Sequence, residues 1–327
     1  MRHAITIVVV IAASFASSFT VLSQTPAAPG RSPSNAEEFD RLFHEVKNWG
    51  RWGPEDQLGS VNLITAAKRK QALSLAKTGQ TVSLVHNPLT DKSEDNASPF
   101  EHTMNPGFTT DTYRVSYHGY SHSHMDALCH ILYKDQTYNG YARAVVNTDK
   151  GCTKLGIENL KQGLVTRGVL IDIPRLKGLP YLEPGTAIYQ EDVEAWEKMS
   201  GAKIASGDVI LLRTGRWARR AKVGPWPVGR SAAGFHASII PFIKARGVAI
   251  VGSDDAAEVT PTLVTGVALP VHTLLVTALG INILDNQDLE ALAETAARLK
   301  RWEFMMVINP MPVTGGTGSP MNTIAIF

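Results

Sequence analysis

The pattern of apolar and polar positions predicts a chain in which helices alternate with short buried strands. Six stretches suit helices: 34–50, 63–79, 191–201, 232–247, 270–280 and 289–300. Six short runs, mostly apolar and bounded by Gly, Pro or polar residues, suit strands: 80–87, 168–174, 207–215, 248–254, 281–286 and 302–310. This alternation is typical of the α/β or mixed α+β class.

Local signals refine these elements. Ser34 and Glu37 have the spacing of a capping box at the start of the first helix, and Pro241 should interrupt or kink the helix over 232–247. Residues 91–110 are polar and irregular, which predicts a long loop. The sequence contains no internal repeat and no Gly/Ser linker. We therefore expect a single domain over residues 34–327.

The first residues have the layout of a secretory signal. Arg2 precedes an apolar run over 4–13 that is followed by small residues. We predict a signal peptide over 1–23, with cleavage after Ala16 as the alternative, and a disordered lead-in over 24–33. An uncleaved anchor is the competing interpretation, but the apolar run is short for a membrane span. We expect an exported protein, periplasmic or secreted, without stable membrane insertion after cleavage.

The charge and the cysteine content argue against a nucleic-acid-binding protein and against a disulfide-rich one. The net charge is +2, from 32 basic and 30 acidic residues, and no basic block suggests a nucleic-acid partner. Cys129 and Cys152 are the only two cysteines, too few for a disulfide framework. An oxidising compartment would permit them to pair. We nevertheless expect two buried, unreactive thiols.

Histidine is concentrated in one segment, "YHGYSHSHMDALCH" over 117–130, which holds four of the ten histidines. If residues 115–126 form one strand, alternate side chains share a face. Those side chains are His118, Tyr120, His122, His124 and Asp126. Imidazole and carboxylate ligands on one face are a plausible half-site for Zn²⁺ or Mn²⁺. A solvated or buried polar face and a pH sensor are the alternatives.

Other residues could complete such a site. If a helix follows Asp126, His130 would lie on the same face four residues later, beside the metal, where it suits a general acid/base. Further ligands must come from elsewhere, and His272 and Asp285 are the candidates. The carboxylates of "SDDAAE" over 253–258 suit a turn or a supporting role better than direct catalysis. The segment "TGGTGSP" lacks the Lys of a phosphate loop.

The segment "SHSHMDALCH" resembles the signature His-x-Gly-Thr-His-x-Asp-Ala-Pro-x-His of the cyclase-like metal-dependent hydrolases, which include bacterial kynurenine formamidase and isatin hydrolase. His124, Asp126, Ala127 and His130 match its second His, Asp, Ala and final His. Further resemblances occur in the family's order along the chain: "WGPEDQLGSVNLIT", "GVLIDIP", "GDVILLRTG", "LPVHTLLVTALGINILDN" and "GGTGSP".

The resemblance implies a swivelling β/β/α fold with a mixed sheet flanked by helices, usually as a homo-oligomer. It also implies one or two divalent metals, with His124 and Asp126 as ligands, His130 as proton donor and acceptor, and His272 with Asp285 completing the site. Formamidases carry Glu where this chain has Asp285.

The first signature His is replaced by Tyr120, and His122 stands at the signature's Gly position. His118 or His122 could supply the missing ligand, and we favour His118. The expected function is metal-dependent hydrolysis of an amide, lactam, ester or lactone in a small molecule, with C–N cleavage favoured. A lyase or lactonase on the same site and a non-catalytic metal- or ligand-binding protein are the alternatives.

Overall fold

The computed structural model describes residue 1, residues 31–147 and residues 149–327. Apart from Met1, the predicted signal peptide lies outside the described residues, as does most of the predicted lead-in. No helix in the described part of the chain is long and apolar enough to cross a bilayer.

The centre of the fold is a nine-stranded mixed sheet with the order β1-β15-β13-β7-β9-β11-β12-β4-β14. Its four middle strands β7, β9, β11 and β12 run parallel, and antiparallel strands extend both edges. The sheet strands are β1 (Thr81–Ser83), β4 (His124–Asp126), β7 (Leu164–Asp172), β9 (Val209–Arg213), β11 (Ile250–Ser253), β12 (Asn282–Asp285), β13 (Glu303–Ile308), β14 (Gly318–Pro320) and β15 (Ile324–Ile326). This mixed sheet with flanking helices confirms the predicted fold class.

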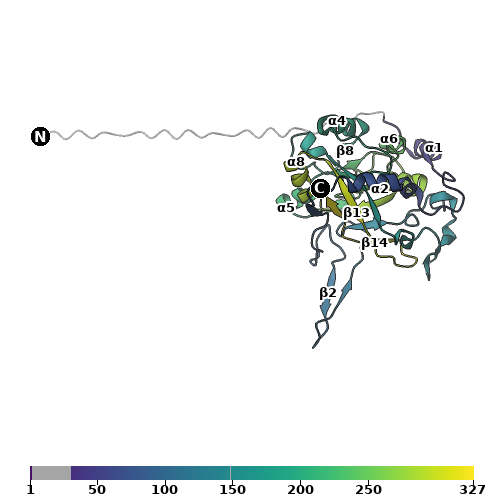
Figure 1. Cartoon of the computed structure of the whole chain (residues 1–327), viewed down its shortest axis with the longest axis horizontal. Coiled ribbons are helices and arrows are strands. Elements are labelled where there is room, and N and C mark those ends of the chain that lie inside the picture. The colour runs from purple at the N-terminus through teal and green to yellow at the C-terminus, as the bar shows by residue number, and fades with distance from the viewer. Residues whose placement is uncertain (2–30, 148) are drawn as a thin grey trace.

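Helices surround the sheet (Figure 1). They are α1 (Ala36–Val46), α2 (Ala66–Leu73), α3 (Ile173–Leu176), α4 (Gln190–Ser200), α5 (Arg216–Val223), α6 (Ile240–Arg246), α7 (Pro270–His272) and α8 (Glu290–Leu299), and α7 continues into a π-helical segment, η7 (Thr273–Leu279). Helix α2 packs on β7 and β13, whereas α1 and α6 pack against η7. Buried apolar side chains from residue 39 to residue 327 form one contiguous core.

Each of the twelve predicted elements has a counterpart, and most are shorter than predicted. The exceptions are β7, which begins at Leu164 and is longer than the predicted strand, and α4, which is displaced by one residue. Asn35, not Ser34, caps α1 by accepting from the N–H groups of Glu37 and Glu38. Pro241 stands in the first turn of α6, after a 3₁₀ turn over Ala237–Ile239. Proline is tolerated there because the first N–H groups of a helix have no partner within the helix. The proline therefore starts α6 instead of kinking a longer helix.

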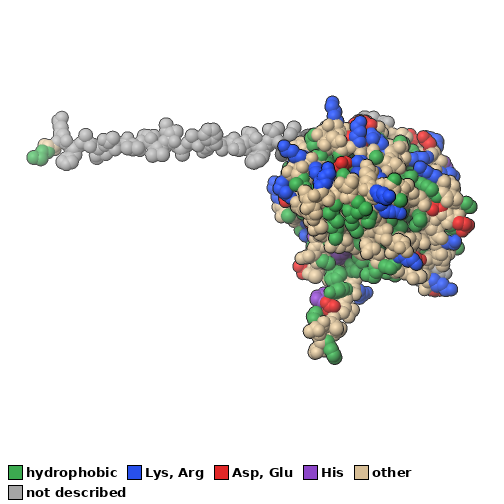
Figure 2. All heavy atoms as spheres, viewed as in Figure 1, with side chains coloured by type: hydrophobic (Ala, Val, Ile, Leu, Met, Phe, Trp, Pro, Cys, Tyr) green, Lys and Arg blue, Asp and Glu red, His purple; other side chains and the backbone are tan. Residues whose placement is uncertain are grey.

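The predicted loop over 91–110 is partly wrong. It contains β2 (Glu101–Met104), which pairs with β3 (Asp111–Arg114) in an antiparallel hairpin that projects from the body of the molecule (Figure 1). All eight strand residues are exposed, and apolar atoms reach its tip (Figure 2). Without a buried face the strands lack the apolar alternation that identifies strands in a sequence.

In the described part of the chain, three short strand pairs lie outside the large sheet. Besides the β2–β3 hairpin, β8 (Ala187–Ile188) pairs with β10 (Gly234–Phe235), and β5 (Val146–Asn147) pairs with β6 (Gly151–Cys152).

The expectation of two free thiols is wrong, because Cys129 and Cys152 form a disulfide. Both residues are buried, with exposed fractions of 1% and 3%. Strand β6 folds back beside the turn that follows β4, which brings together cysteines that lie 23 positions apart in the sequence. Sequence spacing alone does not reveal this tertiary proximity.

Candidate metal centre

Strand β4 places the central residues of the site in the sheet. It pairs with β12 on one side, where His124 lies opposite Asp285, and with β14 on the other, where Asp126 lies opposite Gly318. His124, Asp126 and Asp285 are buried, and their ligand atoms lie within 4.8 Å of one another. Since β12 is a parallel strand that ends at Asp285, the site lies at the carboxyl end of the parallel strands, where α/β sheets commonly bind ligands.

The backbone orients the ring of His124. Its Nδ1 lies 2.8 Å from the carbonyl oxygen of His122, which can only accept, so Nδ1 carries the proton. Nε2 then faces the carboxylates, 3.5 Å from Asp126 Oδ1 and 3.9 Å from Asp285 Oδ2. Burial lowers the pKa of His124, but the neighbouring Asp126 outweighs this effect and the net pKa is raised.

A buried carboxylate orients His272 in the same way. His272 Nδ1 lies 2.7 Å from Glu258 Oε1, while the N–H of Val271 donates to Glu258 Oε2 at 2.9 Å. His272 Nε2 faces Asp285 Oδ2 at 3.2 Å and Asp126 Oδ2 at 4.0 Å. Burial lowers the pKa of His272, but the carboxylates of Asp285 and Glu258 raise it well above its ordinary value. Glu258 therefore has the supporting role expected for the "SDDAAE" segment.

The single strand over 115–126, on which the shared face depended, does not form. Only 124–126 are extended in the sheet, and residues 118–121 form a turn. The turn sends the candidate side chains in different directions. His118 Nδ1 approaches Asp126 Oδ1 at 3.1 Å, and its Nε2 bonds with Thr317 Oγ1. His122 Nε2 bonds instead with the carbonyl oxygen of Ser98.

Tyr120 is half-buried, and its ring lies so close to Gly229 that a Cβ at that glycine would come within 2.7 Å of the ring. Burial, together with the nearby carboxylates of Asp255, Glu258 and Asp285, raises the pKa of the Tyr120 phenol. A phenol that keeps its proton is a weak metal ligand at neutral pH. Of the three candidates for the first ligand, the structure therefore brings His118 to Asp126.

His130 lies beside the carboxylates, but no helix carries it. A turn follows Asp126 instead, closed by a hydrogen bond from the N–H of His130 to the carbonyl oxygen of Ala127. His130 Nε2 is 4.0 Å from Asp126 Oδ2, and its ring stacks on His118 with centroids 3.8 Å apart. Burial lowers the pKa of His130, with Asp126 acting in the opposite direction. The imidazole is therefore neutral at pH 7 and able to accept a proton.

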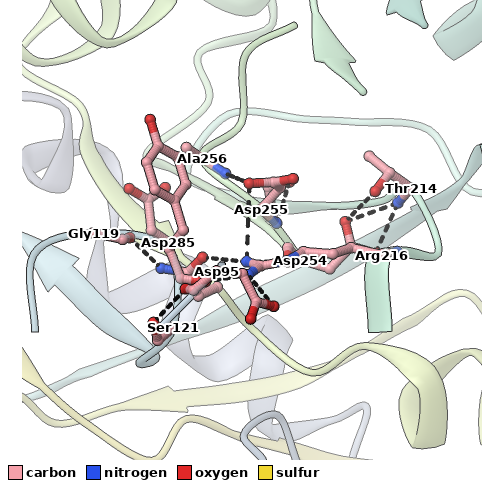
Figure 3. A network of polar contacts seen from close by, with 12 residues as sticks. Asp95, Gly119, Ser121, Thr214, Arg216, Asp254, Asp255, Ala256 and Asp285 are labelled. Atoms are coloured by element: carbon pink, nitrogen blue, oxygen red, sulfur yellow. Dashed lines mark hydrogen bonds and ion pairs between the residues drawn. The ribbon is translucent and has the colours of Figure 1, made fainter. Parts of the chain in front are cut away.

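A polar network that the sequence did not reveal holds the loop before β4 (Figure 3). Arg216 donates to the carbonyl oxygen of Tyr120 and, at 2.5 Å, to Asn286 Oδ1. Asn286 in turn donates to the carbonyl oxygens of Gly119 and His122. Arg216 and Asn286, from distant segments, therefore hold the loop that leads to His124 by hydrogen bonds to its backbone carbonyl oxygens.

Buried carboxylates balance the charge of Arg216. Asp95 and Asp255 approach its guanidinium at 3.7 and 3.9 Å from two sides (Figure 3). Asp254 caps the first turn of α5, accepting from the backbone N–H groups of Thr214, Gly215 and Arg216. Burial raises the pKa of Asp255 to about 7, although Arg216 opposes the shift. The first half of the "SDDAAE" segment thus supports the wall of the site.

Asp285 Oδ1, which is buried, has no hydrogen-bond partner among the described residues. His118 Nδ1 and Asp126 Oδ1 lie 3.1 Å apart but have no hydrogen bond of suitable geometry with each other or with another described group. Leaving buried polar atoms unpaired costs about 1–3 kcal/mol each. A divalent cation bound by imidazole nitrogens and carboxylate oxygens would satisfy them, and this donor set suits Zn²⁺ or Mn²⁺. The residues present therefore fit the metal that the sequence predicts.

Two cavities adjoin the centre. The larger, about 400 Å³, is lined by Ala36, His130, Ile131, Leu132, Tyr133, Gly266, Val267, Ala268, Leu269 and Thr273. The smaller, about 130 Å³, is bordered by residues 94–98 and 116–122, including His118 and Tyr120. His130 borders the larger cavity and His118 the smaller, and the two rings stack on each other. The larger cavity is mostly apolar, with one imidazole in its wall, and its volume falls within the range of small-molecule sites.

Comparison with known proteins agrees with this fold. The family described as "Putative cyclase" matches residues 81–258. A crystal structure of a novel cyclase superposes with a TM-score of 0.77 at 32% identity, covering 87% of this chain and 99% of that one. No curated protein sequence matches significantly.

Two isatin hydrolases share the fold at lower identity. Isatin hydrolase A from Labrenzia aggregata, bound to benzyl benzoate, gives a TM-score of 0.52 at 18% identity, covering 78% of this chain and 97% of that one. An isatin hydrolase bound to the product analogue thioisatinate gives a TM-score of 0.53 at 18% identity, covering 80% of this chain and 99% of that one. The match over just over half of the sequence, with the 32% identity to a solved cyclase, shows that this chain belongs to the cyclase family.

Proposed function

We propose that this protein is a metal-dependent hydrolase that cleaves an amide or lactam, or a related ester or lactone, in a small molecule. The observation that supports the proposal most directly is that two groups of candidate ligands share Asp126. One group adds His118 and His130 and the other adds His124 and Asp285. His272 Nε2 lies 3.2 Å from Asp285 Oδ2. A divalent metal bound there would supply a water of lowered pKa and polarise the substrate's carbonyl group. The isatin hydrolases of the same fold act, by name, on a lactam.

The residues of this chain have separate tasks in such a reaction. Glu258 and the carbonyl oxygen of His122 hold His272 and His124 with their Nε2 atoms toward the carboxylates. His130, neutral at pH 7, accepts a proton at a ring nitrogen and delivers it to the leaving nitrogen or oxygen. The stacking of His130 on His118 keeps its ring plane fixed while the proton moves.

The apolar cavity beside His130 is the proposed substrate site. Its lining by Ile131, Leu132, Val267 and Leu269 favours a substrate with an apolar or aromatic part attached to the scissile group. A polar substrate would leave its own polar groups unpaired against this wall.

We further propose that the protein acts outside the cytoplasm. Besides the predicted signal peptide, the Cys129–Cys152 disulfide supports this location, because structural disulfides persist mainly in oxidising compartments. Expression of the full chain in a bacterial host, followed by fractionation and sequencing of the mature N-terminus, tests it. Accumulation of the uncleaved chain in the cytoplasm would contradict export.

The full chain loaded with Zn²⁺ or Mn²⁺ should hydrolyse at least one member of a panel of N-formyl arylamines, lactams, lactones and aryl esters. Asp126→Ala should abolish metal binding, measured by elemental analysis after dialysis. His130→Ala should keep the metal and lose activity by about 10²–10⁴-fold. Full metal occupancy without turnover on the whole panel would favour a binding protein, and full activity in His130→Ala would refute the role of His130.

A further inference from the structure

We propose that the Cys129–Cys152 disulfide is a positioning element for His130, so that catalysis depends on the oxidised state of this cysteine pair. The proposal rests on the function proposed above. Cys129 immediately precedes His130 in the turn after β4, and its sulfur is bonded to Cys152 at the end of β6.

His130 has few other restraints. Within the described part of the chain its ring makes no hydrogen bond, and the closest carboxylate oxygen, Asp126 Oδ2, is 4.0 Å away. The turn is held by hydrogen bonds from the N–H of Ala127 to Thr317 O and from the N–H of His130 to Ala127 O. Directly after His130, Thr277 Oγ1 donates to the carbonyl oxygen of Ile131 at 3.1 Å. Loss of the disulfide would therefore leave the ring dependent on these three hydrogen bonds of the backbone and on stacking.

The other end of the disulfide is firmly anchored. The N–H of Cys152 donates to Gly315 O at 2.8 Å, and the N–H of Gly315 donates to Glu158 Oε1. Gly151 approaches Gly315 so closely that a Cβ at Gly151 would lie 2.2 Å from Gly315 O. The same loop carries Thr317, whose hydroxyl bonds with His118. Both rings of the stacked pair are thus fixed from one loop, His118 through Thr317 and His130 through the disulfide.

Apart from His118, which stacks on His130 and is held by Thr317, the candidate metal ligands do not share this dependence. His124 and Asp126 lie on β4, which is paired on both sides, while Glu258 orients His272. Breaking the disulfide should release His130 without displacing these residues. A displacement of about 1 Å in a reacting group can cost roughly a hundredfold in rate. The disulfide should therefore affect turnover more than metal affinity.

The test is reduction of the metal-loaded full chain by a water-soluble phosphine. The phosphine gives two electrons to the disulfide and takes oxygen from water, yielding a phosphine oxide and two protein thiols. The matched variant is Cys129→Ala/Cys152→Ala, which has no disulfide to reduce. We expect reduced wild type and the double variant to lose at least about tenfold in kcat, with KM and metal content changed less than twofold.

The double variant also controls for removal of metal by the phosphine. Because this variant has no disulfide, treatment with the phosphine should leave its activity unchanged. Equal kcat before and after complete reduction, checked by titrating two thiols per chain, would overturn the proposal. So would a loss of activity that follows loss of metal.

Hydrogen exchange separates this proposal from the proposed function, because it needs no substrate. Backbone amides of residues 127–131 should exchange faster after reduction, whereas those of β9 and β11 should not change. Inactivity of the wild type on every substrate, with faster exchange at 127–131, would refute the hydrolase and leave the positioning role intact. Unchanged exchange in the fully reduced protein would refute the positioning role.

Discussion

Replacing Glu258 with Gln should weaken metal binding, although Glu258 is not one of the candidate metal ligands. Glu258 is 2% exposed, and each of its oxygens accepts one hydrogen bond, from His272 Nδ1 at 2.7 Å and from the N–H of Val271 at 2.9 Å. A Gln can accept only one of these bonds, and its amide NH₂ would face the second donor.

The size of the effect follows from these contacts. A hydrogen bond to a charged group contributes about 1.5–3 kcal/mol, and about 1.4 kcal/mol corresponds to a factor of ten in affinity. Glu258→Gln should therefore lower the affinity for Zn²⁺ or Mn²⁺ by about 10–100-fold, the range typical of residues that orient a ligating His. Competition with a chromophoric chelator measures this affinity.

Glu197→Gln is the matched control. Glu197 is also buried, at 6% exposure, and also accepts two hydrogen bonds, from the N–H of Ile204 at 2.7 Å and from Arg246 at 2.9 Å. It lies on α4, and its partners are outside the metal centre. Both variants should lose stability in urea, but only Glu258→Gln should lose metal affinity. Equal affinity in Glu258→Gln and wild type would refute the orienting role of Glu258.

Three further predictions follow from the geometry. Since the pKa of His272 is raised well above 6.5, its ring is protonated in the metal-free protein at pH 7, and metal binding must release that proton. The apparent metal affinity should therefore rise with pH, and calorimetry in buffers of different ionisation enthalpy should detect the released proton. A metal affinity that is independent of pH between 6 and 8 would contradict this. Gly59→Ala should destabilise the protein by more than about 2 kcal/mol, because Gly59 has a φ of +57° and an added Cβ would lie 2.1 Å from Gly280 O at the end of η7. Gly50→Ala is the control for backbone strain alone, since Gly50 has a φ of +75° and no neighbour within 4 Å of an added Cβ. Equal unfolding midpoints for the two variants would show that the contact with Gly280 is unimportant. Burial lowers the pKa of His86, so the unfolded chain takes up a proton near pH 6.5 that the folded state excludes, and the free energy of unfolding should fall as pH drops below 6.5. In urea titrations at pH 7 and pH 5, His86→Phe should lose less stability between the two pH values than the wild type. An equal loss in the two proteins would assign the pH dependence to other groups.

The sequence predicts those parts of the molecule whose signals are local. Buried strands such as β9 and β11 are continuous apolar runs between glycines and polar residues, and helices such as α8 carry their own periodic pattern. The short spacing of His124, Asp126 and His130 likewise directed attention to the segment on which the site is built. The ligand roles of the five candidate side chains stay predictions that metal analysis can test, and the acid/base role of His130 stays a prediction that kinetics can test.

The errors arise where distant segments decide the conformation. Residues 115–123 could have been a strand by composition, but Arg216 and Asn286 bind their carbonyl groups and hold a turn. Without that turn His118 would not reach Asp126. Cys129 and Cys152 gave no local sign of pairing, because their proximity depends on the contact of Gly151 with Gly315.

The sequence by itself thus determined the α/β class and most element positions, and it supplied candidates for metal binding, because periodicity and side-chain chemistry are properties of neighbouring residues. Only the tertiary structure decided which histidine faces Asp126, that Glu258 orients His272, and that a disulfide adjoins His130. Those outcomes depend on strand register and on hydrogen bonds between distant segments, such as the bond from Arg216 to the carbonyl oxygen of Tyr120, 96 positions away. No local pattern encodes them.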